Sequence, residues 1–414
     1  MKKLLLICLL AMAGPLAFGN GYQVLLQGNK ETAMGNAGAG LTPSASALFF
    51  NPGALGFLEK TELQFGGNGI FGRTNYVEFG GTEEFEARPV IGTGYLYFVY
   101  AKDSASRFRA GLGVFTPFGS LVEYEDPNWP GRNSVRKLRL VSVFIQPTVA
   151  YRISDKLSIG AGLDIALGDV NLTRRQSNDI FGDIGDVELD GTSDIAFGFN
   201  AGIFYKPFDE FSLGVSYRSK VDAEVVGGDV NFSNLSSAFQ NNAAFQATLP
   251  NTFDAKIPLP SVFTLGLGAY PTDKLSLAMD FSFVGWSAYE ELRFDFDVGD
   301  PSVNVRNYTN SIVIHFGAEY MLTEKLAARA GFYYDDSPVN GGFMTPETPD
   351  ANAKGYTAGL GYEISDKFTL DVSFLFLDKQ KRSNTVPSNV ATGGIDGIYK
   401  TNVLIPGFGI SWRP

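Results

Sequence analysis

The sequence predicts an all-β fold, a 14-stranded antiparallel transmembrane β-barrel. Three features predict it: a turn pattern that recurs along the chain, strands of about ten residues with one apolar and one polar face, and long connections that alternate with short turns. The composition agrees, since 48 Gly, 35 Phe and 18 Tyr among 414 residues suit many strands that turn tightly and pack closely.

The recurring pattern is an aromatic residue, a short polar turn and a new strand. Clear copies begin at Tyr151, Tyr205, Tyr270, Tyr320 and Tyr362, and a looser copy begins at Tyr100. Each turn contains Asp, Glu, Ser or Thr, which are residues typical of hairpin connections. A tyrosine at the turn end of a strand also fits the interfacial aromatic girdle of a membrane barrel.

The strands that leave these turns alternate between two kinds of residue. After Lys156, one face carries Leu157, Ile159, Ala161, Leu163, Ile165 and Leu167, and the strands after Lys274 and Lys367 follow the same pattern. Such alternation marks strands with one apolar and one polar face. A soluble sandwich would alternate too, but its strands are usually about five or six residues long, so the longer strands favour a membrane barrel.

The number of strands is consistent with a closed bacterial barrel. Six short turns give twelve strands, and one strand around 61–73 and another around 398–412 make fourteen, an even number with both ends on the periplasmic side. The long external loops are expected at about residues 74–88, 119–135, 170–191, 220–258, 287–306, 336–353 and 379–398.

The N-terminus predicts export. Lys2 and Lys3 precede an apolar run from Leu4 to Ala13 and a small-x-small site at 17–19, so residues 1–19 have the features of a cleaved signal peptide. The alternative, a retained anchor, is disfavoured because the apolar run is too short to span a bilayer. The only cysteine, Cys8, lies in this segment, so the mature chain has no disulfide or thiolate site. Export and a barrel together predict the outer membrane of a Gram-negative bacterium.

Residues 20–59 do not alternate and are rich in glycine and alanine, with Asn51, Pro52 and Gly53 near their end. The segment is either a disordered leader or a plug inside the barrel, where small residues allow close packing against the wall. A short helix is expected to start between Ser44 and Ala47, because Pro43 suits a helix N-terminus.

One run in this segment resembles a known family. The residues from Met34 to Leu55, MGNAGAGLTPSASALFFNPGAL, are similar to the N-terminal hatch of the FadL family, outer-membrane transporters of long-chain fatty acids that also include aromatic-hydrocarbon channels. Asn51 and Pro52 match the Asn-Pro pair of that hatch, and Gly53 stands where Ala is common. Weaker similarities are the runs 116–119, 247–250 and 285–287. The last aromatic residue, Trp412, stands two positions before the end, whereas such barrels usually finish on an aromatic residue.

The resemblance implies a monomeric barrel (residues 60–414) plugged by a hatch (residues 20–59). A hydrophobic ligand, a long-chain fatty acid or an aromatic hydrocarbon, would be captured between external loops, diffuse passively to a pocket in the barrel and leave sideways at a kinked third strand. The third strand is expected at 107–119, and Pro117 and Gly119 would form the kink, since proline removes a ladder donor. The alternative is that Pro117 ends the strand at the rim.

Candidate ligand contacts come from an apolar loop and from inward side chains. Phe232, Phe239 and Phe245 lie in the 220–258 loop, and they either bind ligand or pack against neighbouring loops. The alternation places six charged or titratable residues on the lumen face: Arg218, Asp280, His315, Glu319, Arg329 and Asp371. Arg218 or Arg329 would suit a fatty carboxylate, or the set forms internal salt bridges.

Strand eight departs from this pattern. If Tyr270 faces lipid, Leu265 and Leu267 point inward and line an apolar pocket; a bulge would instead return both leucines to the lipid face.

Other function classes fit poorly. A net charge of −11 disfavours a nucleic-acid partner. With His315 as the single histidine and no Gly-x-Ser-x-Gly motif, an enzyme is not expected. No metal or cofactor is expected, because the acidic stretch 179–190 lacks the spacing of a calcium loop. A general porin or a purely structural barrel is the remaining alternative, and membrane lipid and lipopolysaccharide are the expected surroundings.

Overall fold

The computed structural model describes residues 21–41, 43–178 and 182–414. The expected signal peptide (residues 1–19) and the start of the acidic stretch at Asp179 lie outside the described residues. Within the described part of the chain, none of the helices has the length and apolarity that a membrane span needs.

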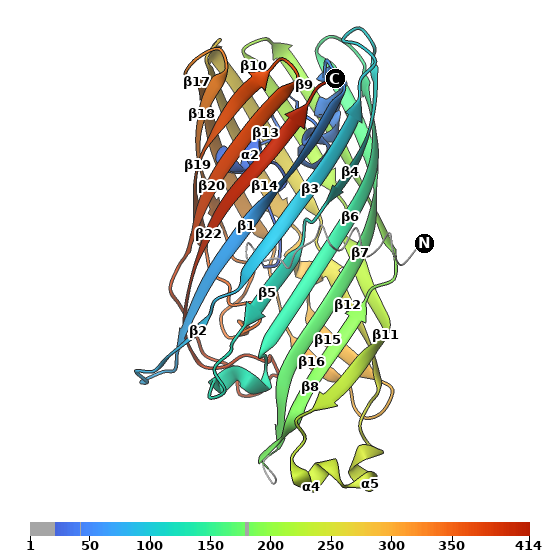
Figure 1. Ribbon diagram of the computed structural model, residues 1–414, viewed down its shortest axis with the longest axis vertical. Coiled ribbons are helices and arrows are strands. Elements are labelled where there is room, and N and C mark those ends of the chain that lie inside the picture. The colour runs from blue at the N-terminus through green and yellow to red at the C-terminus, as the bar shows by residue number, and fades with distance from the viewer. Residues whose placement is uncertain (1–20, 42, 179–181) are drawn as a thin grey trace.

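The described chain forms a closed antiparallel barrel, and the prediction of fourteen strands is confirmed (Figure 1). The ring closes where the first strand pairs with the last, from Leu63 opposite Trp412 to Val77 opposite Ile398. In order around the wall the strands are β1 (Glu62–Val77), β3 (Val90–Tyr100), β4 (Phe108–Phe115) continued by β5 (Gly119–Glu123), β6 (Lys137–Arg152), β7 (Leu157–Asn178), β9 (Ala196–Phe208), β10 (Phe211–Arg218), β13 (Val262–Thr272), β14 (Leu275–Val284), β17 (Ser311–Met321), β18 (Leu326–Asp335), β19 (Ala353–Ser365), β20 (Phe368–Lys379) and β22 (Gly397–Trp412).

Several of the predicted loops are instead folded extensions of the barrel. The 220–258 region, for example, is mostly a pair of strands with two short helices at its tip, at the end of the molecule opposite the C-terminus (Figure 1). Pairing satisfies the backbone groups of these long connections. The additional elements are β2 (Glu84–Ala87), η2 (Pro130–Asn133), β8 (Gly182–Thr192), β11 (Val221–Ser233), α4 (Ser237–Gln240), α5 (Ala243–Gln246), β12 (Thr252–Leu259), η3 (Trp286–Ala288), β15 (Glu291–Phe296), β16 (Ser302–Val305) and β21 (Arg382–Asn384).

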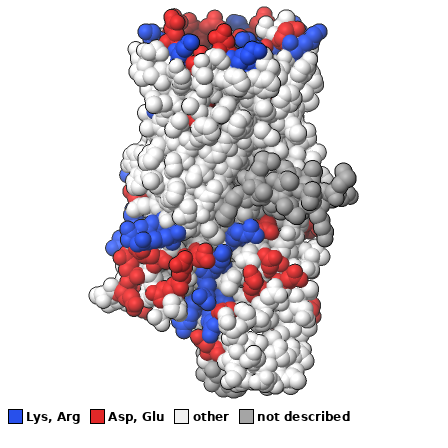
Figure 2. All heavy atoms as spheres, in the orientation of Figure 1, with Lys and Arg blue, Asp and Glu red and all other residues white. Residues whose placement is uncertain are grey.

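The two faces of the wall differ as the alternation predicts. On β20, Val372 and Phe374 are 47% and 45% exposed on the outside, whereas Asp371 and Ser373 are buried inside. Figure 2 shows a wide band almost free of charged residues between a charged rim at one end and a charged region at the other. An apolar outer band of this kind is the surface that a barrel presents to lipid.

The segment 21–58 is almost entirely buried and packs against the inner face of the wall. It contains α2 (Asn29–Ala33), α3 (Ala47–Phe50) and the 3₁₀ turn η1 (Pro52–Phe57), so the expected short helix begins at the end of the range 44–47. Helix α2 lies within the outline of the barrel (Figure 1), and η1 packs against β6, β7 and β9.

Glycine permits this close approach. A Cβ added to Gly53 would lie 2.7 Å from the Gly202 carbonyl carbon of β9, which is closer than real Cβ contacts.

Candidate functional site

The third strand of the wall is interrupted. β4 ends at Phe115 and β5 begins at Gly119, and between them Pro117 supplies no backbone N–H. The pairing of β3 with β4 stops at Leu96 opposite Val114, while β5 pairs with β6. The alternative that Pro117 ends the strand at the rim is wrong, because the strand resumes as β5. The chain thus has a break in its wall at residues 116–118.

The N-terminal stretch 22–27 occupies this break. Gln23 forms an isolated β-bridge with Phe118. Val24 N donates to Pro117 O at 2.8 Å, and Gly119 N donates to Tyr22 O at 2.7 Å. The Gln27 amide also donates to Thr116 O at 2.6 Å. Backbone groups that a neighbouring wall strand would satisfy are therefore satisfied by a separate, terminal piece of chain.

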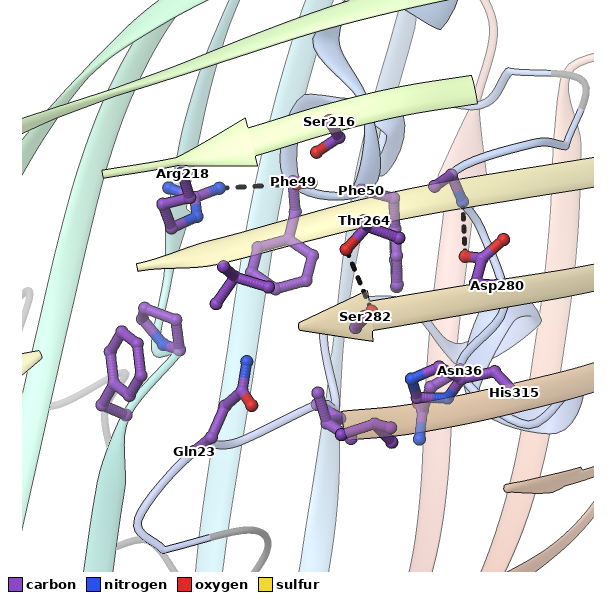
Figure 3. A pocket seen from close by; sticks show the side chains of 16 residues that line it. Gln23, Asn36, Phe49, Phe50, Ser216, Arg218, Thr264, Asp280, Ser282 and His315 are labelled. Atoms are coloured by element: carbon purple, nitrogen blue, oxygen red, sulfur yellow. Dashed lines mark hydrogen bonds between the residues drawn. The ribbon is translucent and has the colours of Figure 1, made fainter. Parts of the chain in front are cut away.

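A small cavity of about 50 Å³ lies beside the break (Figure 3). Its lining combines aromatic rings such as Phe49, Phe50 and Phe118 with polar side chains, among them Asn36 of the segment and Arg218, Asp280 and His315 of the wall. Three of its buried side chains have atoms without a protein partner among the described residues: Gln23 Oε1, Asp280 Oδ1 and both amide atoms of Asn36. A cavity of this size and polarity has room for ordered water.

Asp280 and His315 hold the segment to the wall next to this cavity. They lie opposite each other on β14 and β17. Asp280 Oδ2 accepts hydrogen bonds from Gly38 N at 2.7 Å and Ala39 N at 2.8 Å, and His315 Nδ1 lies 2.7 Å from Gly35 O. The sequence placed both side chains on the lumen face, and their burial confirms this.

The two arginines predicted as ligand contacts are held in ion pairs. Arg218 Nη1 lies 2.6 Å from Asp164 Oδ2, and its guanidinium lies 5.1 Å from the ring centre of Phe49. Arg329 binds Glu319 at 2.6 Å and Asp371 at 2.5 Å, and Glu319 also binds Lys30 of the segment at 3.3 Å. The geometry supports the alternative interpretation, an internal salt-bridge network.

A second, outer pocket of about 30 Å³ is lined mainly by apolar side chains. Its walls come mainly from β6, β7, β12 and β15 and from Tyr22, and include Leu140, Val170, Leu172, Ile257 and Phe294. Glu347, whose carboxylate is paired with Arg306, also lines it. Tyr22 lines this outer pocket, whereas Gln23 and Leu25 line the inner cavity. The stretch 22–25 therefore lies between the two spaces and also pairs with the break.

Arg174 is the charged residue near the outer pocket that the sequence analysis missed. It lies two residues beyond Leu172 on the same face of β7, and its buried Nε has no partner among the described residues. From Asp169 onward the opposite face of β7 is polar, so Arg174 lies beyond the apolar band. Burial lowers the pKa of Arg174, and Glu347, which binds Arg306 at 2.5 Å, acts in the opposite direction. The sequence did contain a feature that indicates Arg174: the period-two alternation of β7 places it on the same face as Gly168, Val170 and Leu172.

The predicted loop phenylalanines do not line either space. Phe239 on α4 and Phe245 on α5 have ring centres 4.4 Å apart at the tip of the molecule (Figure 1). Phe232 on β11 is partly buried against the main hydrophobic core. These rings therefore pack inside the protein, Phe239 and Phe245 against each other and Phe232 against the core, whereas the alternative expected them to pack against neighbouring loops.

The prediction that Leu265 and Leu267 line an inner pocket is wrong. They are 45% and 39% exposed on the outer face of β13. The prediction assumed that Tyr270 faces lipid. Tyr270 instead lies on the same face of β13 as Gly266 and Gly268, which lie against Gly40 on the inner side. The alternation of β13 is therefore regular here, and the register shift comes later, between Ala269 and Thr272.

The Asn-Pro-Gly run connects two parts of the segment to the wall. The Asn51 amide donates to Ala39 O at 2.9 Å and to Ile203 O at 3.1 Å, and Asn51 Oδ1 accepts from Gly53 N at 3.0 Å. Asn51 thereby caps η1, and Pro52 occupies the first position of that turn.

Comparison with known proteins agrees with this architecture. A putative outer membrane protein of Neisseria meningitidis is 25% identical over 421 residues, which cover 90% of this chain and 89% of that protein. A long-chain fatty acid transport protein of Escherichia coli O6:H1 is 23% identical over 303 residues, covering 66% and 67%. The crystal structure of a Pseudomonas aeruginosa FadL homologue superposes with a TM-score of 0.84 at 19% identity, covering 95% and 99%.

A family model described as outer membrane protein transport protein (OMPP1/FadL/TodX) matches residues 10–413. The chain therefore belongs to the OMPP1/FadL/TodX family of outer membrane transporters of hydrophobic compounds.

Proposed function

We propose that this protein carries long-chain fatty acids across the outer membrane by passive diffusion. The path runs from the outer pocket, past residues 22–25, into the inner cavity and out through the break in the third strand. The observation that carries the proposal is the position of residues 22–25, which separate the two spaces and fill the break.

The outer pocket suits the two ends of a fatty acid. Its apolar lining would bury the hydrocarbon chain, which is favourable by about 0.8 kcal/mol per buried CH₂ group. Beyond the apolar lining, Arg174 offers a guanidinium that has no ion pair within the described part of the chain, and a buried cation is stabilised by an anionic group that hydrogen-bonds to it. The related E. coli protein named as a long-chain fatty acid transport protein supports the same class of ligand.

The described state is a plugged one. The two spaces measure about 30 and 50 Å³, which is room for only a few water molecules, since a cavity needs roughly 10–15 Å³ to hold one. A long-chain ligand therefore has to displace part of the segment 21–58. Residues 28–58 are held by buried polar anchors such as Lys30–Glu319 and Asp280 with Gly38, so we assign the movement to residues 21–27.

Sideways release follows from the chemistry of the ligand. A molecule that leaves through the wall enters lipid and avoids the cost of exposing apolar surface to water. At the break the wall opens without the loss of ladder hydrogen bonds between β3 and β5, because none connect residues 90–95 with 119–123. We propose that one barrel performs all these steps and that the protein acts as a monomer.

The test compares the intact mature barrel with a variant lacking residues 20–59, both reconstituted and titrated with a labelled long-chain fatty acid. The expected result is saturable binding to the intact protein, competed by unlabelled fatty acid, with steady ion conductance only in the truncated form. Steady conductance through the intact protein without binding would overturn the proposal and support a general porin. An intact barrel with neither binding nor conductance would move the ligand class to aromatic hydrocarbons.

A further inference from the structure

The outer face of the barrel carries a boundary between apolar and polar residues that is aligned on five neighbouring strands. At the end with the long connections, which is the external end of such barrels, the register aligns one exposed apolar residue on each strand: Tyr356, Phe376, Leu404, Phe71 and Val90. Their exposure ranges from 38% to 64%. We call these five residues the apolar row.

The two outward positions beyond the apolar row hold polar residues on every one of these strands. Six are charged: Lys354, Asp378, Lys400, Arg73, Glu86 and Arg88. The other four are amides: Asn352, Gln380, Asn402 and Asn75. We call these ten residues the polar rows. With four cations against two carboxylates, they carry an excess of positive charge on a protein whose net charge is −11.

The positive charge is accessible. Arg73 and Arg88 share one carboxylate, Glu86, and their side chains are 55% and 65% exposed. Lys400 binds Asp378 at 2.5 Å. Lys354 is exposed and has no ion pair among the described residues. Two cationic charges of the polar rows are thus left without a carboxylate of their own.

The external surface formed by β11, β12 and β15 is balanced. Lys220, which immediately precedes β11, and Lys256 on β12 share Asp222 and Glu224 in a cluster without net charge. Arg293 binds Asp295 on the neighbouring strand β15. Figure 2 shows Lys and Arg directly below the uncharged band, where head groups of the outer leaflet would lie.

We propose that the apolar row and the polar rows form a binding site for the lipid A part of lipopolysaccharide. Its acyl chains lie on the apolar row, its phosphates bind the cations, and the amides bind its sugar hydroxyls. Guanidinium and ammonium groups at the level of the head groups are the chemistry that recognises phosphate. An amide-rich surface adds the donors and acceptors that a sugar needs.

The test uses protein refolded into detergent micelles, free of lipopolysaccharide, and titrated with fluorescent lipid A or with the same lipid after removal of its phosphates. The wild-type protein is expected to bind lipid A more tightly than the dephosphorylated form. The variant R73Q/R88Q/K354Q is expected to lose about tenfold or more in affinity, as three cations near a phosphate-bearing surface are removed. The matched variant K220Q/K256Q, in the balanced cluster, is expected to bind as the wild type does.

Each alternative outcome counts against the proposal. Equal affinity for lipid A with and without phosphates would overturn it, as would an equal loss of affinity in the two variants. Equal competition by phosphatidylglycerol vesicles would replace lipid A with any anionic lipid and so overturn the assignment. Heat-modifiable migration in gels and unchanged fatty-acid binding show that both variants are folded.

Discussion

The buried arginines of this barrel fall into three groups. Arg218, Arg306 and Arg329 each bind a carboxylate. Among the described residues Arg109 binds backbone carbonyls, including Leu58 O at 2.6 Å, and so fixes the end of the segment 21–58 to the first short turn, which joins β3 to β4. Arg174 differs from both groups, because among the described residues it has neither an ion pair nor a partner for its buried Nε. A guanidinium of this kind is available to an incoming anion.

Replacement of Arg174 tests its proposed role as the headgroup contact. Arg174→Met keeps the apolar stem and removes the charge, so affinity for a long-chain fatty acid is expected to fall by roughly tenfold or more, the effect of losing a charged hydrogen bond of about 1.5–3 kcal/mol. Fluorescence titration measures this change. Affinity for the fatty alcohol of the same length should stay unchanged; an equal loss for acid and alcohol would show that Arg174 shapes the pocket and does not bind the carboxylate.

Gly53 is the residue at which the segment most directly requires the absence of a side chain. Gly53→Ala is expected to push η1 from the Gly202 backbone, at a cost of about 1–3 kcal/mol for overpacking, and to produce brief channel openings in planar bilayers. Gly341→Ala is the control, since a Cβ at Gly341 meets nothing within 4 Å. If neither Gly53→Ala nor Gly341→Ala showed channel openings, the close packing of η1 against the Gly202 backbone would be contradicted.

At the scale of elements, the turn pattern and the alternation were sufficient to predict the fourteen strands but not their outer extensions. The reason is visible in β7. From Leu157 to Leu167 the apolar residues face outward to lipid, whereas beyond the membrane Val170 and Leu172 face inward and the outer face is polar. The phase of the hydrophobic pattern therefore inverts within one strand, and the sequence of the extension resembles that of a loop.

The contacts of the segment 21–58 were also beyond the sequence analysis. Asp280 and Gly38 are separated by 242 positions, and Thr357 binds Ala33 O across 324 positions. The alternation placed Asp280 on the lumen face, but no local pattern shows which backbone groups it binds. The same limit explains why Arg218 was considered for the ligand although its charge is used by Asp164.

Pro117 has a specific effect on the pairing at the break. Val24 N donates to Pro117 O, but proline has no N–H to return a bond to Val24 O, which accepts from the Gln27 amide at 3.0 Å. Pro117→Ala is expected to add this backbone bond, worth about 0.5–1.5 kcal/mol, and so to hold residues 22–24 more firmly. Fatty-acid uptake should slow about two- to tenfold while equilibrium binding to the outer pocket persists.

The control for this variant is Pro406→Ala, an outward position on β22 away from the break. Uptake through that variant should match the wild-type rate. Faster uptake in Pro117→Ala would mean that the proline keeps the break closed and would reverse its proposed role.

At the scale of the whole molecule, the barrel provides a fixed wall and the first described residues provide the movable part. The Lys30–Glu319 ion pair and hydrogen bonds from Arg109 and Asn200 connect residues 28–58 to several strands around the lumen. Residues 22–24 are attached mainly at the break, through two backbone hydrogen bonds and the contacts of Tyr22. Under the proposed function, movement of this short stretch would join the outer pocket to the inner cavity and open the break in one step. The shape of the molecule thus couples ligand passage to a small displacement.

The most direct test of this account is a disulfide between Gln23→Cys and Phe118→Cys. The two residues form a non-hydrogen-bonded bridge pair, for which the Cα atoms lie about 4.5 Å apart, within the range of a disulfide. A control disulfide joins Thr74→Cys and Thr401→Cys, whose hydroxyls lie 2.8 Å apart in the closing seam of the barrel. If the account is right, oxidation of the first pair abolishes uptake of a labelled long-chain fatty acid, reduction restores it, and the control pair transports in both states. Normal uptake through the oxidised Gln23–Phe118 pair would contradict it.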